Sequence, residues 1–147
     1  MNLNEYISNQ QKKINEAEET EKRDRINLSI KKEKFNENCD NAFFKLTKNI
    51  VALSKSGTFE SKEEIFENTE FTKSKRFEIN IYIQQMPAQY YINLTAKYQE
   101  DENNQNLTFS VYSSGYNKTI DKKFTFEEFE KSDFEELLVK CLNEFEQ

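Results

Sequence analysis

The first 56 residues of this chain contain neither glycine nor proline, and Gly57 is the first residue with the properties of a helix stop. Glycine and proline are the two residues that most strongly disfavour a helix interior. We therefore predict that residues 4–55 are helical. In the second half of this stretch, apolar residues recur at steps of three and four, which indicates one buried stripe: Phe35, Cys39, Phe43, Leu46, Ile50 and Leu53.

Residues 10–34 are poor in apolar residues but rich in charge pairs. Glu18–Lys22, Glu19–Arg23 and Glu21–Arg25 place an acid four residues before a base, and each such pair stabilises a helix by about 0.2–0.5 kcal/mol. This half can therefore be helical with little tertiary support. Asn27 and Ser29 are both residues that cap helices, so one long helix and two successive helices both fit the pattern.

Two domains are predicted: residues 1–34 as a projecting or pairing helical arm, and residues 35–147 as a single α+β domain. A coiled coil needs two apolar seams. One seven-residue line along the predicted helix is mostly apolar and is interrupted by Glu21; it holds Ile7, Ile14, Leu28, Phe35 and Ala42. The other line holds Leu3, Gln10, Ala17, Asp24 and Lys31. A coiled-coil homodimer formed through this arm therefore stays an alternative.

Period-two alternation of apolar residues follows Gly57. It predicts three clear strands, at residues 76–83, 91–98 and 107–112, and a weaker fourth at 117–124. Before them, Ser61 and Glu64 fit a capping box, which predicts a short helix at 62–68. Residues 84–89, which include Pro87, are predicted to form a loop.

The last segment has the pattern of a helix start. Ser132-Asp133-Phe134-Glu135 fits a second capping box, and an apolar stripe follows it: Phe134, Leu138, Cys141 and Phe145. Short connections between strands favour an antiparallel meander. The predicted fold is α+β: a four-stranded antiparallel meander sheet covered on one face by helices, in a two-layer sandwich with a long N-terminal helix and a C-terminal helix.

Composition removes much of the usual catalytic chemistry. The chain has no histidine and two cysteines, so histidine-based triads and structural zinc sites are excluded. No pair of carboxylates is singled out for acid–base work. We expect no enzyme, no catalytic residue, no metal and no cofactor. No apolar run approaches a membrane span and the N-terminus lacks a secretory pattern, so we expect a cytoplasmic location without membrane contact.

Charge is unevenly distributed along the chain. Residues 1–56 hold 11 basic and 9 acidic residues, whereas residues 57–147 hold 10 basic and 18 acidic ones, and the whole chain carries −6. An acidic body disfavours direct binding to duplex DNA. The expected partner is another protein, with a nucleic-acid-binding protein as one candidate. Richness in Asn, Lys and Ile suggests a bacterial or phage source with an AT-rich genome.

Two sets of residues are candidate partner-binding sites. Tyr82, Tyr91 and Tyr112 fall on the solvent side of the predicted strands, among Ser, Asn and Thr, a composition found in adaptable binding surfaces. The alternative is that any exposed sheet favours Tyr and Thr. The second set is acidic and suits a basic groove, or else serves solubility and the helix dipole: Glu127, Glu128, Glu130 and Asp133.

From these features we expect a cytosolic protein-interaction module that occludes a partner, as small acidic inhibitors of the immunity, anti-defence or nucleic-acid-mimic type do. The alternative is a structural, oligomerisation or chaperone-like protein that assembles through its N-terminal helix. The first hypothesis rests on size and charge, and the second on the interrupted heptad line.

Overall fold

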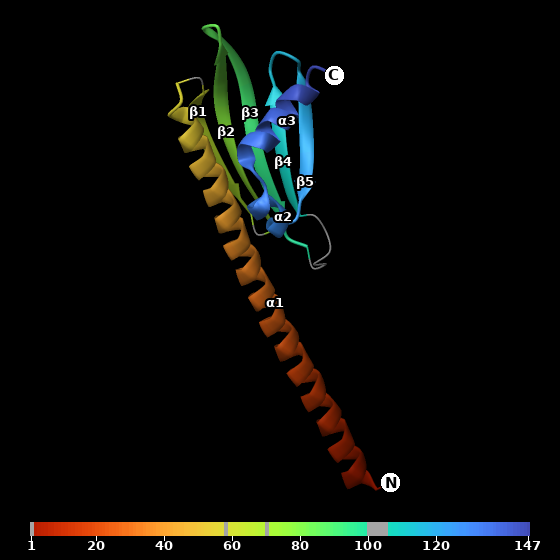
Figure 1. The fold of residues 1–147 in the computed structure, drawn as a ribbon. Coiled ribbons are helices and arrows are strands. Elements are labelled where there is room, and N and C mark those ends of the chain that lie inside the picture. The colour runs from red at the N-terminus through yellow and green to blue at the C-terminus, as the bar shows by residue number, and fades with distance from the viewer. Residues whose placement is uncertain (1, 58, 70, 100–105) are drawn as a thin grey trace. The chain divides into compact units, whose positions relative to one another are not determined.

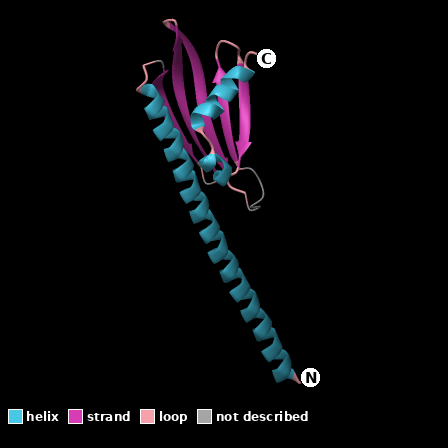
Figure 2. Cartoon of the chain, viewed as in Figure 1, coloured by secondary structure: helices cyan, strands magenta, loops and turns pink. Residues whose placement is uncertain are grey.

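The computed structural model describes residues 2–57, 59–69, 71–99 and 106–147, and it has an α+β fold (Figure 1). A long helix comes first, an antiparallel sheet follows, and two short helices end the chain (Figure 2). The elements are α1 (Leu3–Ser54), β1 (Phe59–Asn68), β2 (Thr72–Ile83), β3 (Met86–Lys97), β4 (Leu107–Ser113), β5 (Lys118–Phe124), α2 (Phe126–Lys131) and α3 (Phe134–Glu144).

Helix α1 is continuous, so of the two predicted alternatives the single helix is confirmed. Asn2 caps its start, where the backbone N–H of Glu5 donates to Asn2 Oδ1 at 2.8 Å. By compactness the chain separates into two units, residues 1–36 and residues 37–147. In the first unit the apolar side chains of the seven-residue line are exposed at Ile7, Ile14 and Leu28. The pairing role of residues 1–34 stays a prediction.

The described part of the sheet has five strands in the order β1-β2-β3-β4-β5, so the predicted count of four is wrong. The additional strand is β1, where a short helix was predicted at 62–68. Its pairing with β2 shifts register between Ser61 and Glu63. Such a bulge puts the residues on its two sides out of phase, which hides the period-two signal. The capping-box pattern at Ser61 and Glu64 is too weak to outweigh pairing along a whole strand.

Alternation along the central strands gives the sheet an inner face of buried side chains. These are Phe77 and Ile79 on β2, Ile92, Leu94 and Ala96 on β3, Leu107, Phe109 and Val111 on β4, and Ile120 on β5. The register places Leu94 opposite Phe109 and Ile92 opposite Val111. Within residues 37–147, helices contact this face. The Phe134 ring of α3 packs edge-on against the Phe109 ring, with 5.9 Å between the ring centroids, and Phe43 of α1 packs against Phe66 of β1.

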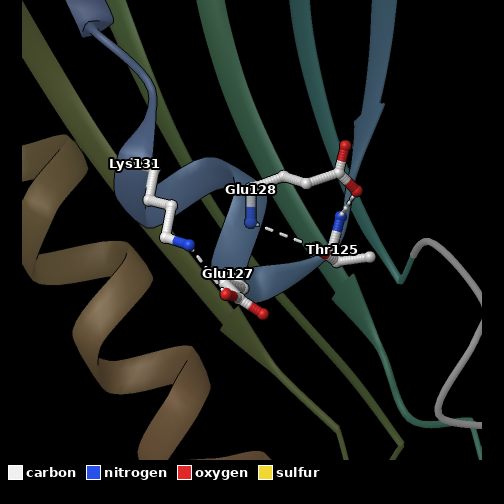
Figure 3. Close-up of polar contacts among 4 residues, drawn as sticks. All are labelled: Thr125, Glu127, Glu128 and Lys131. Carbon is white, nitrogen blue, oxygen red and sulfur yellow. Dashed lines mark hydrogen bonds and ion pairs between the residues drawn. The ribbon is translucent and has the colours of Figure 1, made fainter.

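Helix α2 was not predicted, although it carries its own capping box (Figure 3). The Thr125 hydroxyl accepts from the Glu128 backbone N–H at 3.1 Å, and a Glu128 carboxylate oxygen accepts from the Thr125 N–H at 3.1 Å. The predicted start of α3 is confirmed to within one residue. Its N-cap is Asp133, which accepts from the Glu136 N–H at 3.0 Å, whereas Ser132 is the C-cap of α2.

The β2–β3 hairpin has a loop of two residues, shorter than the predicted loop at 84–89. Gln84 and Gln85 both have positive φ, at 52° and 68°, and Ile83 pairs with Met86 on either side of them. Type I′ turns of this kind match the twist of paired strands but favour Asn and Gly. Pro87 pairs with β2, while pairing of β3 with β4 begins at Tyr90, so Pro87 leaves that ladder intact.

Replacing Gln85 with glycine is expected to raise the free energy of unfolding by about 0.5–1 kcal/mol. A left-handed conformation costs a non-glycine residue about 1–2 kcal/mol, and glycine gives back part of that gain through its greater freedom in the unfolded chain. Urea denaturation of Gln85→Gly measures the difference. Gln99→Gly is the matched control, because Gln99 is exposed and has negative φ. An equal change in the two variants, or a loss of stability in Gln85→Gly, would contradict strain at the turn.

Candidate functional site

The outer face of the sheet is the side whose side chains alternate with the buried ones. It carries Arg76 and Glu78 on β2, Tyr91 and Asn93 on β3, and Ser110 and Tyr112 on β4. The described helices of residues 37–147 contact the inner face instead, through Phe109–Phe134, Phe43–Phe66 and the ion pair between Lys122 and Glu144. The outer face is therefore the open side of this unit.

Three side chains from neighbouring strands form one cluster on the outer face. Tyr91 and Tyr112 are direct cross-strand partners, and their rings lie 6.0 Å apart with a tilt of 40°. The Arg76 guanidinium lies over the Tyr91 ring, 5.1 Å from its centroid. The Tyr112 hydroxyl donates to Asn117 Oδ1 at 2.7 Å. These contacts fix the orientation of both rings, so the cluster is preorganised.

Tyr82 lies apart from this cluster. It is four residues beyond Glu78 on β2, about 13 Å along the strand, and Glu78 is the residue opposite Tyr91. Its hydroxyl donates to a Glu60 carboxylate oxygen at 2.6 Å, and this hydrogen bond raises the pKa of Tyr82. Of the three tyrosines predicted for one site, the structure brings together Tyr91 and Tyr112.

The predicted acidic set lies on α2 and at the start of α3, in the helical layer. Glu128 and Asp133 cap the two helices. Glu127 pairs with Lys131 at 2.8 Å (Figure 3), and the hydrogen bond from Lys131 lowers the pKa of Glu127. The backbone carbonyl of Glu130 accepts a hydrogen bond from Lys45. Because these helices pack on the inner face, the acids and the tyrosine pair lie on opposite sides of the sheet and cannot form one continuous site.

Sequence reasoning missed a small cavity on the outer face, which we call the Asn93 hollow. It is lined by Ile65, Glu67, Ser74, Arg76 and Asn93, with a volume of about 110 Å³. Asn93 Oδ1 is buried there and accepts no hydrogen bond from the described residues. Two of the lining residues belong to β1, which was predicted as a helix. The sequence signal for this cavity is the alternation at Ile65 and Glu67, which places both side chains on one face of a strand.

The cysteines are poor candidates for reactive groups. Cys39 and Cys141 are fully buried, and burial raises the pKa of the Cys39 thiol to about 12 and that of Cys141 to about 11. Both thiols are therefore protonated at neutral pH, and a thiol is a weak nucleophile. Among the described residues, no group of three or more His, Cys, Asp or Glu side chains is placed to hold a metal ion.

Comparison with known proteins gave no match. No protein-family model, no curated protein and no solved structure is similar to this chain at a significant level. The helices in the described residues are also too short or too polar to cross a membrane.

Proposed function

We propose that this chain is a protein-interaction module that binds a basic protein partner through the outer face of its sheet and thereby occludes it. The observation that carries the proposal is the cluster of Arg76, Tyr91 and Tyr112 on the open side of the sheet. Tyrosine and arginine dominate binding hot spots, because they supply large contact areas that also form hydrogen bonds. A preorganised cluster of both loses little conformational entropy on binding.

The charge of this unit supports a basic partner. Residues 37–147 carry 13 basic and 20 acidic residues, a net charge of −7, whereas residues 1–36 carry 8 basic and 7 acidic ones. Long-range attraction between surfaces of opposite charge raises the rate of association and disfavours acidic competitors. A nucleic-acid-binding protein has a surface of this kind, which is consistent with a small acidic inhibitor.

Affinity capture with two matched double variants tests the proposal. Tyr91→Ala/Tyr112→Ala alters the outer face, and Glu127→Gln/Glu130→Gln alters the helical layer while sparing the capping residues Glu128 and Asp133. We expect the unmodified chain and the acid variant to capture one stoichiometric partner from the source cells. The tyrosine variant should bind it about 30-fold or more weakly, as expected for loss of about 2 kcal/mol of hot-spot contacts. Circular dichroism confirms that each variant is folded.

Two outcomes would contradict the proposal. Loss of binding in the acid variant alone would move the partner surface to α2 and α3. A stable dimer by light scattering, with no captured partner, would favour the alternative of a structural protein assembled through residues 1–34. That alternative draws on the apolar side chains exposed along the seven-residue line of α1 at Ile7, Ile14 and Leu28.

A further inference from the structure

The Asn93 hollow contains a hydrogen-bond acceptor that the described residues leave unsatisfied. Asn93 Oδ1 is buried there, and the two cross-strand neighbours of Asn93 are Arg76 on β2 and Ser110 on β4. Both neighbours carry donors, so either one has the chemistry to satisfy Asn93. A buried acceptor without a donor has lost its hydrogen bonds to water, and no hydrogen bond within the protein replaces them. A donor from outside the chain would therefore bind here with a net gain.

The donors of both cross-strand neighbours are directed elsewhere. The Arg76 guanidinium lies over the Tyr91 ring at 5.1 Å from its centroid, and the Ser110 hydroxyl donates to Asp121 Oδ1 at 2.6 Å. Arg76 is a diagonal neighbour of Tyr91 on the outer face, because Glu78 is the residue directly opposite Tyr91. The side chain thus leans along the strand toward Tyr91, which accounts for the space above Asn93.

The lining of the Asn93 hollow determines which donor fits. Three of its lining residues carry acceptor oxygens, one from each of three strands: Glu67 of β1, Ser74 of β2 and Asn93 of β3. The Ser74 hydroxyl can also donate. A primary ammonium presents three N–H donors and no acceptor. Ile65 adds an apolar wall suited to the methylene stem of a long side chain. The volume of about 110 Å³ equals that of roughly four water molecules in the liquid, which suits the end of a side chain.

The charges around the Asn93 hollow also favour a cation. Arg76 is one of the lining residues, and its positive charge repels a second cation. The negative charge of Glu67 offsets this repulsion. The Arg76 guanidinium is also held over the Tyr91 ring. The long-range attraction comes from the net charge of −7 on residues 37–147. We infer that the Asn93 hollow receives the ammonium group of a lysine side chain on the basic surface of the partner protein. This inference rests on the proposed function and names the contact that would orient the partner.

Nuclear magnetic resonance titration with a lysine fragment tests the inference without the partner. The probe is Nα-acetyl-lysine amide, added to the isotope-labelled full chain. Nα-acetyl-norleucine amide, which has an apolar side chain of similar length without the ammonium, is the matched control. We expect the lysine fragment to shift the Asn93 side-chain amide and the Ser74 backbone signals with a dissociation constant of about 1–30 mM, a range typical of a fragment in one small cavity. The norleucine fragment should leave both signals unchanged.

Variants separate binding at the Asn93 hollow from general attraction to an acidic protein. Asn93→Leu removes the acceptor and should weaken lysine-fragment binding at least 10-fold, whereas Asn93→Asp keeps an acceptor and should bind at least as well as the unmodified chain. Glu67→Gln should weaken binding about 3-fold or more, as expected for removal of one charge partner. Thr108→Val, on the outer face but outside the hollow, should have no effect.

Several results would overturn the inference. One is an equal shift of the Asn93 and Ser74 signals with the norleucine fragment, and another is no shift of these signals by the lysine fragment at millimolar concentration. The others are tighter binding of Nα-acetyl-glutamine amide than of the lysine fragment, and unchanged binding of the lysine fragment by Asn93→Leu. The proposed function is judged separately, from capture of the partner by the tyrosine variant. Tyrosine-dependent capture with no lysine binding would retain the interaction surface and reject the ammonium site.

Discussion

Replacing Lys45 with methionine is expected to lower the free energy of unfolding by about 2–4 kcal/mol. Lys45 lies on α1, and its ammonium donates to three backbone carbonyls of α2 and of its junction with α3: Phe129 at 2.5 Å, Glu130 at 2.8 Å and Ser132 at 2.6 Å. Hydrogen bonds to a charged group contribute about 1.5–3 kcal/mol each where they are buried. We expect less than the sum of three, because part of this site is in contact with water.

The position of these carbonyls explains why one side chain matters so much. They lie at the C-terminal end of α2 and at its junction with α3, where carbonyl groups lack the N–H donors that a further helical turn would supply. The Phe129 carbonyl also accepts from the backbone N–H and the hydroxyl of Ser132. The negative end of the helix dipole favours a cation at the same place. The ammonium also lies 5.1 Å from the centroid of the buried Phe129 ring. Burial lowers the pKa of Lys45, and the nearby charges of Glu130 and Asp133 oppose that shift.

Lys48→Met is the control for this prediction. Lys48 is exposed on the same helix, three residues further on, so its replacement should change the free energy of unfolding by no more than about 0.5 kcal/mol. Urea denaturation at neutral pH, followed by circular dichroism, measures both variants. A loss below about 1 kcal/mol for Lys45→Met, or equal losses for the two, would show that Lys45 is not what holds α2 in place.

The parts of the fold that were predicted correctly depend on long, regular patterns. The absence of Gly and Pro over 56 residues indicated α1, and alternation over six or more residues indicated β2, β3 and β4. The weaker pattern at 117–124 also proved to be a strand, as β5. β1 was missed because a bulge interrupts its alternation, and α2 because it has only six residues. The Thr-x-x-Glu pattern at Thr125 and Glu128 is the sequence signal that indicates α2.

The candidate site was less predictable than the fold, because it depends on register and on side-chain orientation. Alternation shows that Tyr91 and Tyr112 share a face, but not that they are opposite each other. That fact depends on the pairing of β3 with β4. The Asn93 hollow depends in addition on the direction taken by Arg76 and Ser110, which no sequence pattern encodes. The acidic residues were recognised as a cluster of charge, but their capping roles become clear only once both helices are defined.

The assignment of the two faces can be tested directly by Phe109→Ala, which is expected to lower the free energy of unfolding by about 3–5 kcal/mol. Phe109 is fully buried on the inner face, between Leu94 of β3 and Lys122 of β5, with the Phe134 ring packed edge-on above it. Truncation leaves a cavity in addition to the lost burial. The free energy of unfolding of an ordinary domain is about 5–15 kcal/mol, so the expected loss is a large fraction of the total stability.

Thr108→Ala is the matched control, since Thr108 is the neighbour of Phe109 on β4 and lies on the outer face. Its replacement should lower the free energy of unfolding by about 1 kcal/mol or less, which is the range of strand propensities measured in host proteins. If Phe109→Ala does not fold, Phe109→Leu gives a smaller loss that is still measurable by urea denaturation. A large loss at residue 109 with a small loss at residue 108 would show that the side of β4 bearing Tyr112 is not packed in the core, as the proposed binding face requires. Equal losses would mean that both sides of β4 are buried, which would contradict the proposed binding face.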